Sequence, residues 1–212
     1  MTVGVARAAA PFLLGFDVLA PPTEGMLQAA TARGMRFCGA YLDTLTAATR
    51  DRIFHYGFGI LPYTAALVHE PLSILTGRAR GVWANERAAA LEMPTSVHVG
   101  IDLELPAAGS DCGGHVDAMA VTLQAAQRGA ALYVGVPQPL TGRQLFALLP
   151  DRYIKGAGRV VDAADNLAEP GCGWAALQLE PVEGLLLAGV KVDVEVTKID
   201  YEGRALVLWW PN

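Results

Sequence analysis

Four short segments of the chain alternate apolar and polar residues and end in carboxylates. They are residues 13–17, 97–104, 174–180 and 190–196. In the second segment the odd positions are Val, Val, Ile and Leu, while the even positions are His98, Gly100, Asp102 and Glu104. Because successive side chains of a β-strand point to opposite faces, one face of this segment is predicted to be apolar and the other to carry acids. A hydrophobic core rarely accepts several carboxylates, so acids at the ends of several strands predict a functional site.

The candidate catalytic residues are four acids in these segments: Glu104, Asp102, Asp17 and Asp193. Residues two positions apart on a strand share a face and lie roughly 6–7 Å apart, which applies to Asp102 and Glu104. Like charges at such separations raise one pKa and keep one acid protonated near neutral pH. A protonated carboxyl beside an ionised one is what glycoside cleavage requires. Glu104 is expected to be the protonated acid, since it is nearer the open end of its strand.

Each acid also has a purely structural interpretation. Asp17 could cap the helix that follows it, although it precedes that helix by several residues. Asp193 and Glu195 could form the solvent face of a terminal hairpin together with Lys191, and the pattern favours Asp193 over Glu195 as a site residue. Glu180 could also line a cleft. His98 is expected to be a hydrogen-bonded core residue rather than a base.

Strand-like and helix-like segments alternate from one end of the chain to the other. The predicted strands are 13–18, 35–42, 58–63, 97–105, 130–136, 151–162, 173–180, 190–197 and 204–210. The predicted helices are 24–33, 46–56, 77–93, 116–128 and 141–149. Five strand–helix repeats, followed by strands with little helix between them, predict an α/β fold: a TIM-like parallel barrel with abbreviated helices in the C-terminal part.

An open, doubly wound sheet is the alternative architecture. No GxGxxG or Walker sequence follows a predicted strand, which removes the usual reason for such a sheet. A barrel also explains the acids, because barrel active sites lie at the carboxyl ends of the strands. We therefore expect a single barrel domain over residues 1–212, with its core at about 13–210.

Composition limits the possible partners. The 212 residues are 52% apolar and 17% charged, with a net charge of −5, so disorder and nucleic-acid binding have little support. No apolar stretch is long enough to span a membrane. Cys38, Cys112 and Cys172 are an odd number without a CxxC pair, and the histidines are not spaced with them as zinc ligands. The sequence thus predicts reduced thiols and no metal or other cofactor, and it leaves the oligomeric state open.

The order of the acidic segments resembles one known family. Gly15-Phe16-Asp17, Asp102-Leu103-Glu104, Gln178 and Val192-Asp193 are similar to motifs of the glycoside-hydrolase-like barrels related to the family twenty-five lysozymes. More narrowly, the sequence looks like the bacterial and phage glycoside-hydrolase-like domains formerly of unknown function. This similarity extends from about residue 13 to 210, and Asp-x-Glu is its most specific part. The resemblance implies a muramidase-type site, with Glu104 as general acid, Asp102 as its partner, and Asp17 and Asp193 as flanking carboxylates.

Aromatic residues on the predicted strands are candidates for substrate binding. Tyr41, Tyr63 and Tyr133 could stack on sugar rings or orient a carboxylate through their hydroxyl groups. Gln178 is the fourth candidate. Barrel core packing is the alternative for each tyrosine. Trp174 begins its strand, which suggests the opposite mouth of the barrel.

These features predict a glycoside hydrolase that acts on peptidoglycan or a related polysaccharide. The alternative is a non-catalytic carbohydrate-binding or phage-associated barrel that keeps the acidic cleft. A metal-dependent phosphodiesterase has less support, because His98 is the only histidine near the acids. The first ten residues show no signal-peptide pattern, so we expect synthesis in the cytoplasm and release to the cell wall by lysis or a non-classical route. The end at 207–211 is expected to be core.

Overall fold

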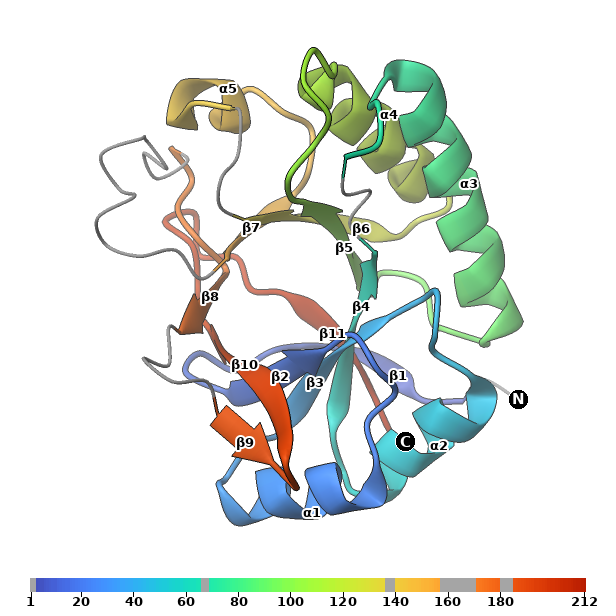
Figure 1. Ribbon diagram of the computed structural model, residues 1–212, viewed down its shortest axis with the longest axis vertical. Helices are drawn as coiled ribbons and strands as arrows, with labels where there is room; N and C mark the ends of the chain where they lie inside the picture. The colour runs from blue at the N-terminus through green and yellow to red at the C-terminus, as the bar shows by residue number, and fades with distance from the viewer. Residues whose placement is uncertain (1–2, 66–68, 136–139, 157–170, 180–184) are drawn as a thin grey trace.

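The centre of the molecule is a closed barrel of eight strands (Figure 1), seen in a computed structural model that describes residues 3–65, 69–135, 140–156, 171–179 and 185–212. Seven strands are parallel: β2 (Leu14–Val18), β3 (Phe37–Tyr41), β4 (Gly59–Thr64), β5 (His98–Leu103), β6 (Gly129–Val134), β7 (Arg152–Lys155) and β8 (Ala176–Leu179). The eighth, β10 (Val190–Thr197), runs antiparallel between β8 and β2. The predicted TIM-like barrel is confirmed, with one correction: its closing strand is antiparallel.

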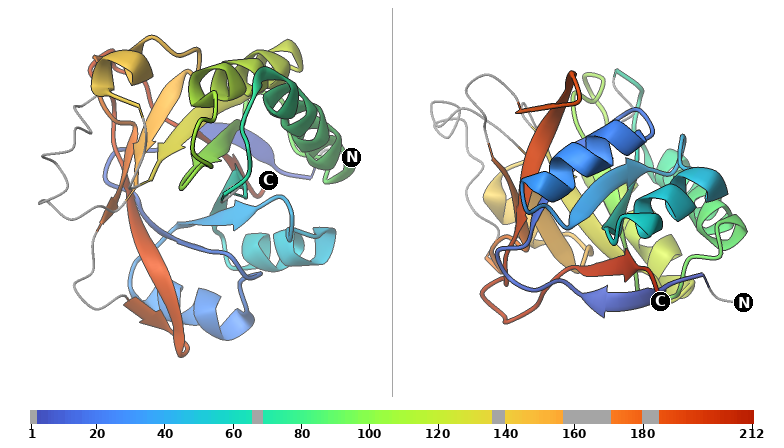
Figure 2. Two further views of the ribbon diagram at one scale, coloured as in Figure 1. Left: turned by 45° about the horizontal axis from the view of Figure 1, so that its top comes forward. Right: turned by 90° about the horizontal axis from the view of Figure 1, so that it is seen from below.

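The helices cover the outside of the barrel (Figures 1 and 2). They are α1 (Glu24–Ala32), α2 (Ala47–His55), α3 (Ile74–Ala90), α4 (Cys112–Ala125) and α5 (Gly142–Phe146). The last has only five residues, and no helix follows it in the described part of the chain. This confirms the predicted shortening of the helices towards the C-terminus. None of the described helices is long and apolar enough to cross a membrane.

Caps set the starts of the helices. The Thr46 hydroxyl accepts a hydrogen bond from the Thr49 N–H at 3.1 Å, as predicted for α2. Thr23 caps α1, so the interpretation of Asp17 as that cap is wrong. A reciprocal pair of bonds between Ser73 and Thr76 starts α3 three residues earlier than predicted. Asp111 likewise caps α4 earlier than the predicted start at 116.

Two terminal strands, one predicted and one not, lie at one end of the barrel. β1 (Val5–Ala8) was not predicted, and it pairs antiparallel with β11 (Val207–Trp210), which in turn pairs with β4. Figure 2 shows this ribbon lying across one end of the barrel. Leu206 and Leu208 are fully buried with residues of the barrel interior, so the hydrophobic C-terminal segment is core, as expected. A third strand, β9 (Leu185–Leu187), forms a hairpin with the start of β10.

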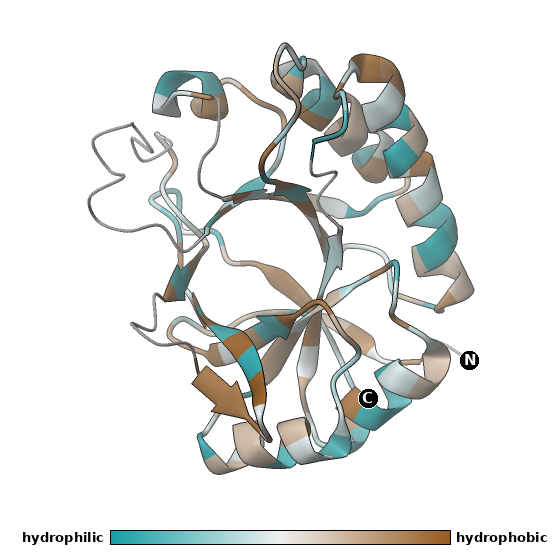
Figure 3. Ribbon diagram, in the orientation of Figure 1, coloured by the Kyte–Doolittle hydropathy of each residue, from teal (hydrophilic) through white to brown (hydrophobic). Residues whose placement is uncertain are grey.

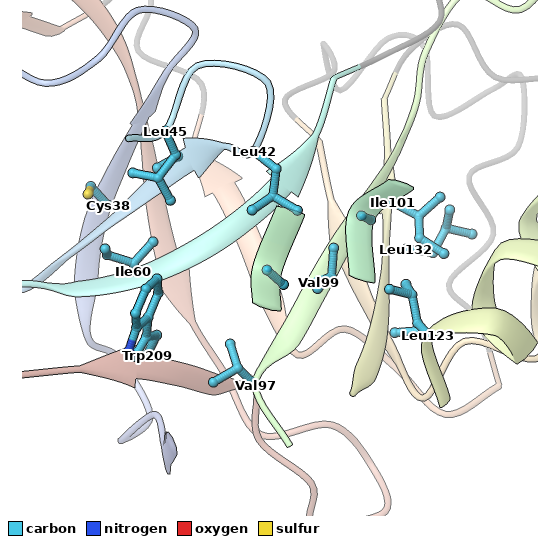
Figure 4. Packing of buried hydrophobic residues seen from close by; sticks show 14 of the residues in the cluster. Cys38, Leu42, Leu45, Ile60, Val97, Val99, Ile101, Leu123, Leu132 and Trp209 are labelled. Carbon is cyan, nitrogen blue, oxygen red and sulfur yellow. The ribbon is translucent and has the colours of Figure 1, made fainter. Parts of the chain in front are cut away.

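The core has two layers, because each barrel strand has an inner and an outer face. The outer layer packs the barrel against the helices, and Figure 4 shows part of it, including Val99, Leu123 and Leu132. The inner layer contains Phe37, Leu61 and other residues between the strands. Figure 3 shows the apolar–polar alternation along β10. The inner face of the barrel is mostly apolar near the ribbon.

Candidate active site

The carboxyl ends of the barrel strands surround a cavity of about 460 Å³. Six of the predicted site residues line it: Asp17, Tyr41, Glu104, Tyr133, Gln178 and Asp193. They come from β2, β3, the end of β5, β6, β8 and β10. Residues far apart in the sequence thus meet because the parallel strands end, and the antiparallel β10 begins, at the same mouth of the barrel.

Asp17 and Asp193 are a pair across two strands. They are direct partners in the antiparallel register of β2 and β10, which places their Cα atoms roughly 4.5–5.5 Å apart. Burial raises the pKa of Asp17 well above its ordinary value, and the charges of Glu195 and Asp193 raise it further. Burial also raises the pKa of Asp193, while nearby Lys191 opposes that change. The pair therefore resists carrying two negative charges.

Glu104 lies just beyond β5 and faces the same cavity. Burial raises the pKa of its carboxyl, a hydrogen bond with Tyr133 lowers it, and the charge of Asp193 raises it. A Cβ atom at Gly135 would collide with Oε1 of Glu104. The Glu104 carboxyl can therefore occupy this position because residue 135 has no side chain. A carboxyl with a raised pKa at an accessible cavity is suited to donate a proton.

Asp102 shares the inward face of β5 with Glu104 but does not line the cavity. It accepts a hydrogen bond from the Tyr41 hydroxyl, with an oxygen–oxygen distance of 3.4 Å. Tyr41 does line the cavity. The connection of Asp102 to the cavity thus runs through the Tyr41 hydroxyl, while Glu104 faces the cavity directly.

Tyrosines line the cavity and fill the core next to it. The Tyr133 hydroxyl donates to Oε1 of Gln178 at 2.8 Å, which joins β6 to β8. The Tyr63 ring lies beneath, with its centroid 5.7 Å from that of Tyr41 and 5.9 Å from that of Tyr133. The three rings therefore pack on each other across the barrel.

Tyr63 and Glu195 differ from the sequence-based expectations. Tyr63 is 1% exposed and does not line the cavity, so its predicted role in substrate binding is corrected. Its ring fills the space left by Gly39 and Gly100 on the flanking strands, and its hydroxyl donates to Oε1 of Glu195 at 2.7 Å. Glu195 is fully buried rather than on a solvent face. Alternation could have found it, because Glu195 must share the inward face with Asp193.

The remaining candidates lie outside the cavity. His98 is buried, and its Nδ1 accepts the Val207 N–H at 2.8 Å, which confirms the predicted core role. Trp174 is buried in the outer core layer, just before the amino end of β8. Glu180 falls outside the described residues. Among the residues that are described, no three His, Cys, Asp or Glu side chains are grouped as metal ligands.

No protein-family model and no curated protein matches the sequence. Solved structures do match the fold. An uncharacterized protein of B. stearothermophilus has 17% identity and a TM-score of 0.66, over 88% of this chain and 96% of that one. The glycosyl hydrolase 25 GHIP of Streptococcus pneumoniae has 11% identity and a TM-score of 0.60, over 88% and 87%. The spore cortex lytic enzyme SleM of Clostridium perfringens has 13% identity and a TM-score of 0.60, over 94% and 71%.

These likenesses cover most of the chain at low sequence identity. They show that the protein has the barrel fold of this group of structures. The fold implied by the resemblance to lysozyme-related barrels is thereby confirmed.

Proposed function

We propose that the protein hydrolyses glycosidic bonds of peptidoglycan or a related polysaccharide. The observation that carries this proposal is the meeting of Glu104, Asp17 and Asp193 at one cavity. The cavity, about 460 Å³, is within the roughly 300–1,000 Å³ of typical ligand sites. The shared fold with a glycosyl hydrolase 25 and a spore cortex lytic enzyme supports the same class of reaction.

Glu104 acts as the general acid in this proposal. Burial raises the pKa of its carboxyl, so that it retains a proton at higher pH than an exposed glutamate does. It donates that proton to the oxygen of the leaving sugar. The negative charge on the Asp17–Asp193 side of the cavity stabilises the positive charge that develops on the sugar ring.

The other residues hold substrate and acids in place. Tyr41 and Tyr133 present hydroxyl groups and ring edges at the cavity wall, and both are tied to polar partners on other strands. Asp102 is held by Tyr41 and acts as the partner of Glu104 on the same strand. A sugar bound in the cavity is thus contacted from β3, β5 and β6 as well as from the Asp17–Asp193 pair.

The test is the substitution Glu104→Gln, which removes the acid and keeps the shape. Removing a general acid costs typically 10²–10⁴-fold in rate, so we expect at least a hundredfold loss in the release of reducing ends from purified peptidoglycan. Glu86→Gln is the matched control, because Glu86 is exposed on α3. Unchanged activity in Glu104→Gln contradicts the assignment of the acid. Binding of glycan without release by the unmodified protein supports the non-catalytic alternative.

A further inference from the structure

Glu195 and Asp17 are two acids inside the barrel on neighbouring strands. Glu195 is opposite Gly15 in the register of β10 and β2, and Asp17 is two positions further along β2 on the same inward face. Glu195 is 0% exposed and Asp17 is 5% exposed. Asp17 lines the cavity, whereas Glu195 lies beneath it and does not. The Asp17 carboxyl thus lies at the cavity, and the Glu195 carboxyl lies in the core beneath it.

The hydrogen bonds of Glu195 are incomplete for an ionised carboxylate. Its Oε1 accepts from the Tyr63 hydroxyl at 2.7 Å. Its Oε2 is buried and has no hydrogen-bond partner within the described residues. The described part of the chain contains no ion pair to Glu195. A fully buried carboxylate without a cation and with one bare oxygen is costly, and a proton on that oxygen removes most of the cost.

The groups that face Glu195 add negative rather than positive charge. Gln178, its direct partner on β8, is neutral. The titratable groups around it are Asp17 on β2, Cys38 and Tyr41 on β3, Tyr63 on β4, Tyr133 on β6 and Asp193 on β10 itself. All of them are neutral or negative. Lys191 is the nearest cation along β10, and it lies exposed at the cavity.

We propose that Asp17 and Glu195 hold one proton between them, and that Glu195 is a positioning residue that sets the charge of Asp17 at the cavity. Two neighbouring carboxyls in a buried site cannot both ionise readily, so their protons leave in two separated steps that belong to the pair. The raised pKa values of both groups agree with this geometry, since each is raised first by burial.

This inference deepens the proposed function and rests on it only for its catalytic consequence. With one shared proton, the pair presents a single negative charge beneath the sugar. Replacing Glu195 by a neutral group lets Asp17 ionise at lower pH, because the competing negative charge is gone. The acidic limb of the activity profile then moves to lower pH, while the maximal rate stays the same.

The direct experiment is a ¹³C NMR titration of the side-chain carboxyls in the intact protein. In the unmodified protein we expect two well-separated steps shared by Asp17 and Glu195, the upper one near neutral pH. Glu195→Gln should leave one step for Asp17, below the upper step of the unmodified protein. Asp17→Asn should leave one step for Glu195 that is likewise lowered. Both carboxyls titrating together below about pH 5 in the unmodified protein overturns the proposal.

Two further measurements separate this inference from the proposed function. Tyr63→Phe removes the hydrogen bond that Oε1 of Glu195 accepts, so the upper step should move to higher pH; no movement overturns the pairing. The pH profile of glycan cleavage by Glu195→Gln should shift on its acidic side at unchanged maximal rate, and an unshifted profile overturns the positioning role. If the unmodified protein cleaves no glycan, the proposed function fails, and the NMR titration still decides whether the proton is shared.

Discussion

The two ends of the barrel use the same inward-facing positions for opposite purposes. At the end covered by β1 and β11, the inward residues are buried and mostly apolar, with Leu206 and Leu208 among them. At the other end they are acids, tyrosines and Gln178 around an accessible cavity. Strand alternation alone does not separate the two ends. The difference is made by the terminal ribbon, which covers one end and leaves the other open.

The segment from His98 to Glu104, which contains β5, shows the difference between the two ends of the barrel. His98 and Glu104 both point inward, six positions apart. Burial lowers the pKa of His98 to about 4 and raises the pKa of Glu104, so both environments favour the neutral form. At the closed end the neutral imidazole is fixed by the Val207 N–H. At the open end the neutral carboxyl keeps a proton that substrate can reach.

The largest expected effect concerns the closed end. Trp209→Ala removes a fully buried indole that packs at 5.2 Å on Phe54 and donates its N–H to the Val3 carbonyl at 2.7 Å. Such truncations cost about 3–5 kcal/mol of unfolding free energy. Leu19→Ala is the counterpart at the open end, where the side chain is 70% exposed, and should change stability by less than about 0.5 kcal/mol. Urea denaturation measures both, and equal losses would contradict the contrast between the ends.

The next effect is that His98, at the closed end, and Glu195, in the core beneath the cavity, change stability with pH in opposite directions. Folded His98, with a pKa of about 4 against 6.5 ordinarily, binds fewer protons than in the unfolded chain, so stability falls as pH drops through that window. The Asp17–Glu195 pair, whose upper step lies at about 7 against an ordinary glutamate pKa of 4.5, binds more protons when folded, so stability falls as pH rises from 4.5 to 7. Each change is worth up to about 3 kcal/mol, since a tenfold change in proton affinity is about 1.4 kcal/mol.

Unfolding free energies measured from pH 4 to pH 9 check this pair of slopes. Glu195→Gln should flatten the fall between pH 4.5 and 7, because the amide does not titrate. His98→Asn should flatten the fall below pH 6.5, even if it lowers stability at every pH. A slope that stays unchanged in either variant would show that the residue does not titrate as its burial requires.

The sequence predicted the architecture well because alternation and caps are local signals. The inward face of 97–104 follows from residue parity alone, and the structure places His98 and Glu104 on it as expected. Starts of helices were less accurate, since the caps Ser73 and Asp111 lie in irregular stretches without periodicity. β1 was missed because a four-residue strand of mixed polarity has no pattern of its own and is fixed by pairing with β11.

For the site, the sequence predicted which residues face the inside of the barrel, but not how far each lies from the cavity. Asp17, Asp193 and Glu195 share one inward surface, yet only the first two reach the cavity. Depth depends on how neighbouring strands are staggered, and that stagger is a property of barrel closure. The same reason explains Tyr63, which is the direct partner of Tyr41 in the register of β3 and β4 and is nevertheless buried. Gly39 and Gly100, which make room for the Tyr63 ring, were the sequence signal that could have indicated its burial.

The smallest effect sharpens the contrast at the open end itself. Gly135→Ala places a methyl group against Cγ, Cδ and Oε1 of Glu104, so the side chain must move, and the open cavity beside it gives it room to do so. We expect roughly a tenfold lower kcat, since displacing a catalytic group by a fraction of an ångström misaligns it, with little change in stability. Gly113→Ala is the control, because its Cβ would meet only Leu148 at 3.7 Å. Activity that is unaffected in Gly135→Ala would mean that the exact position of Glu104 is not important for the reaction.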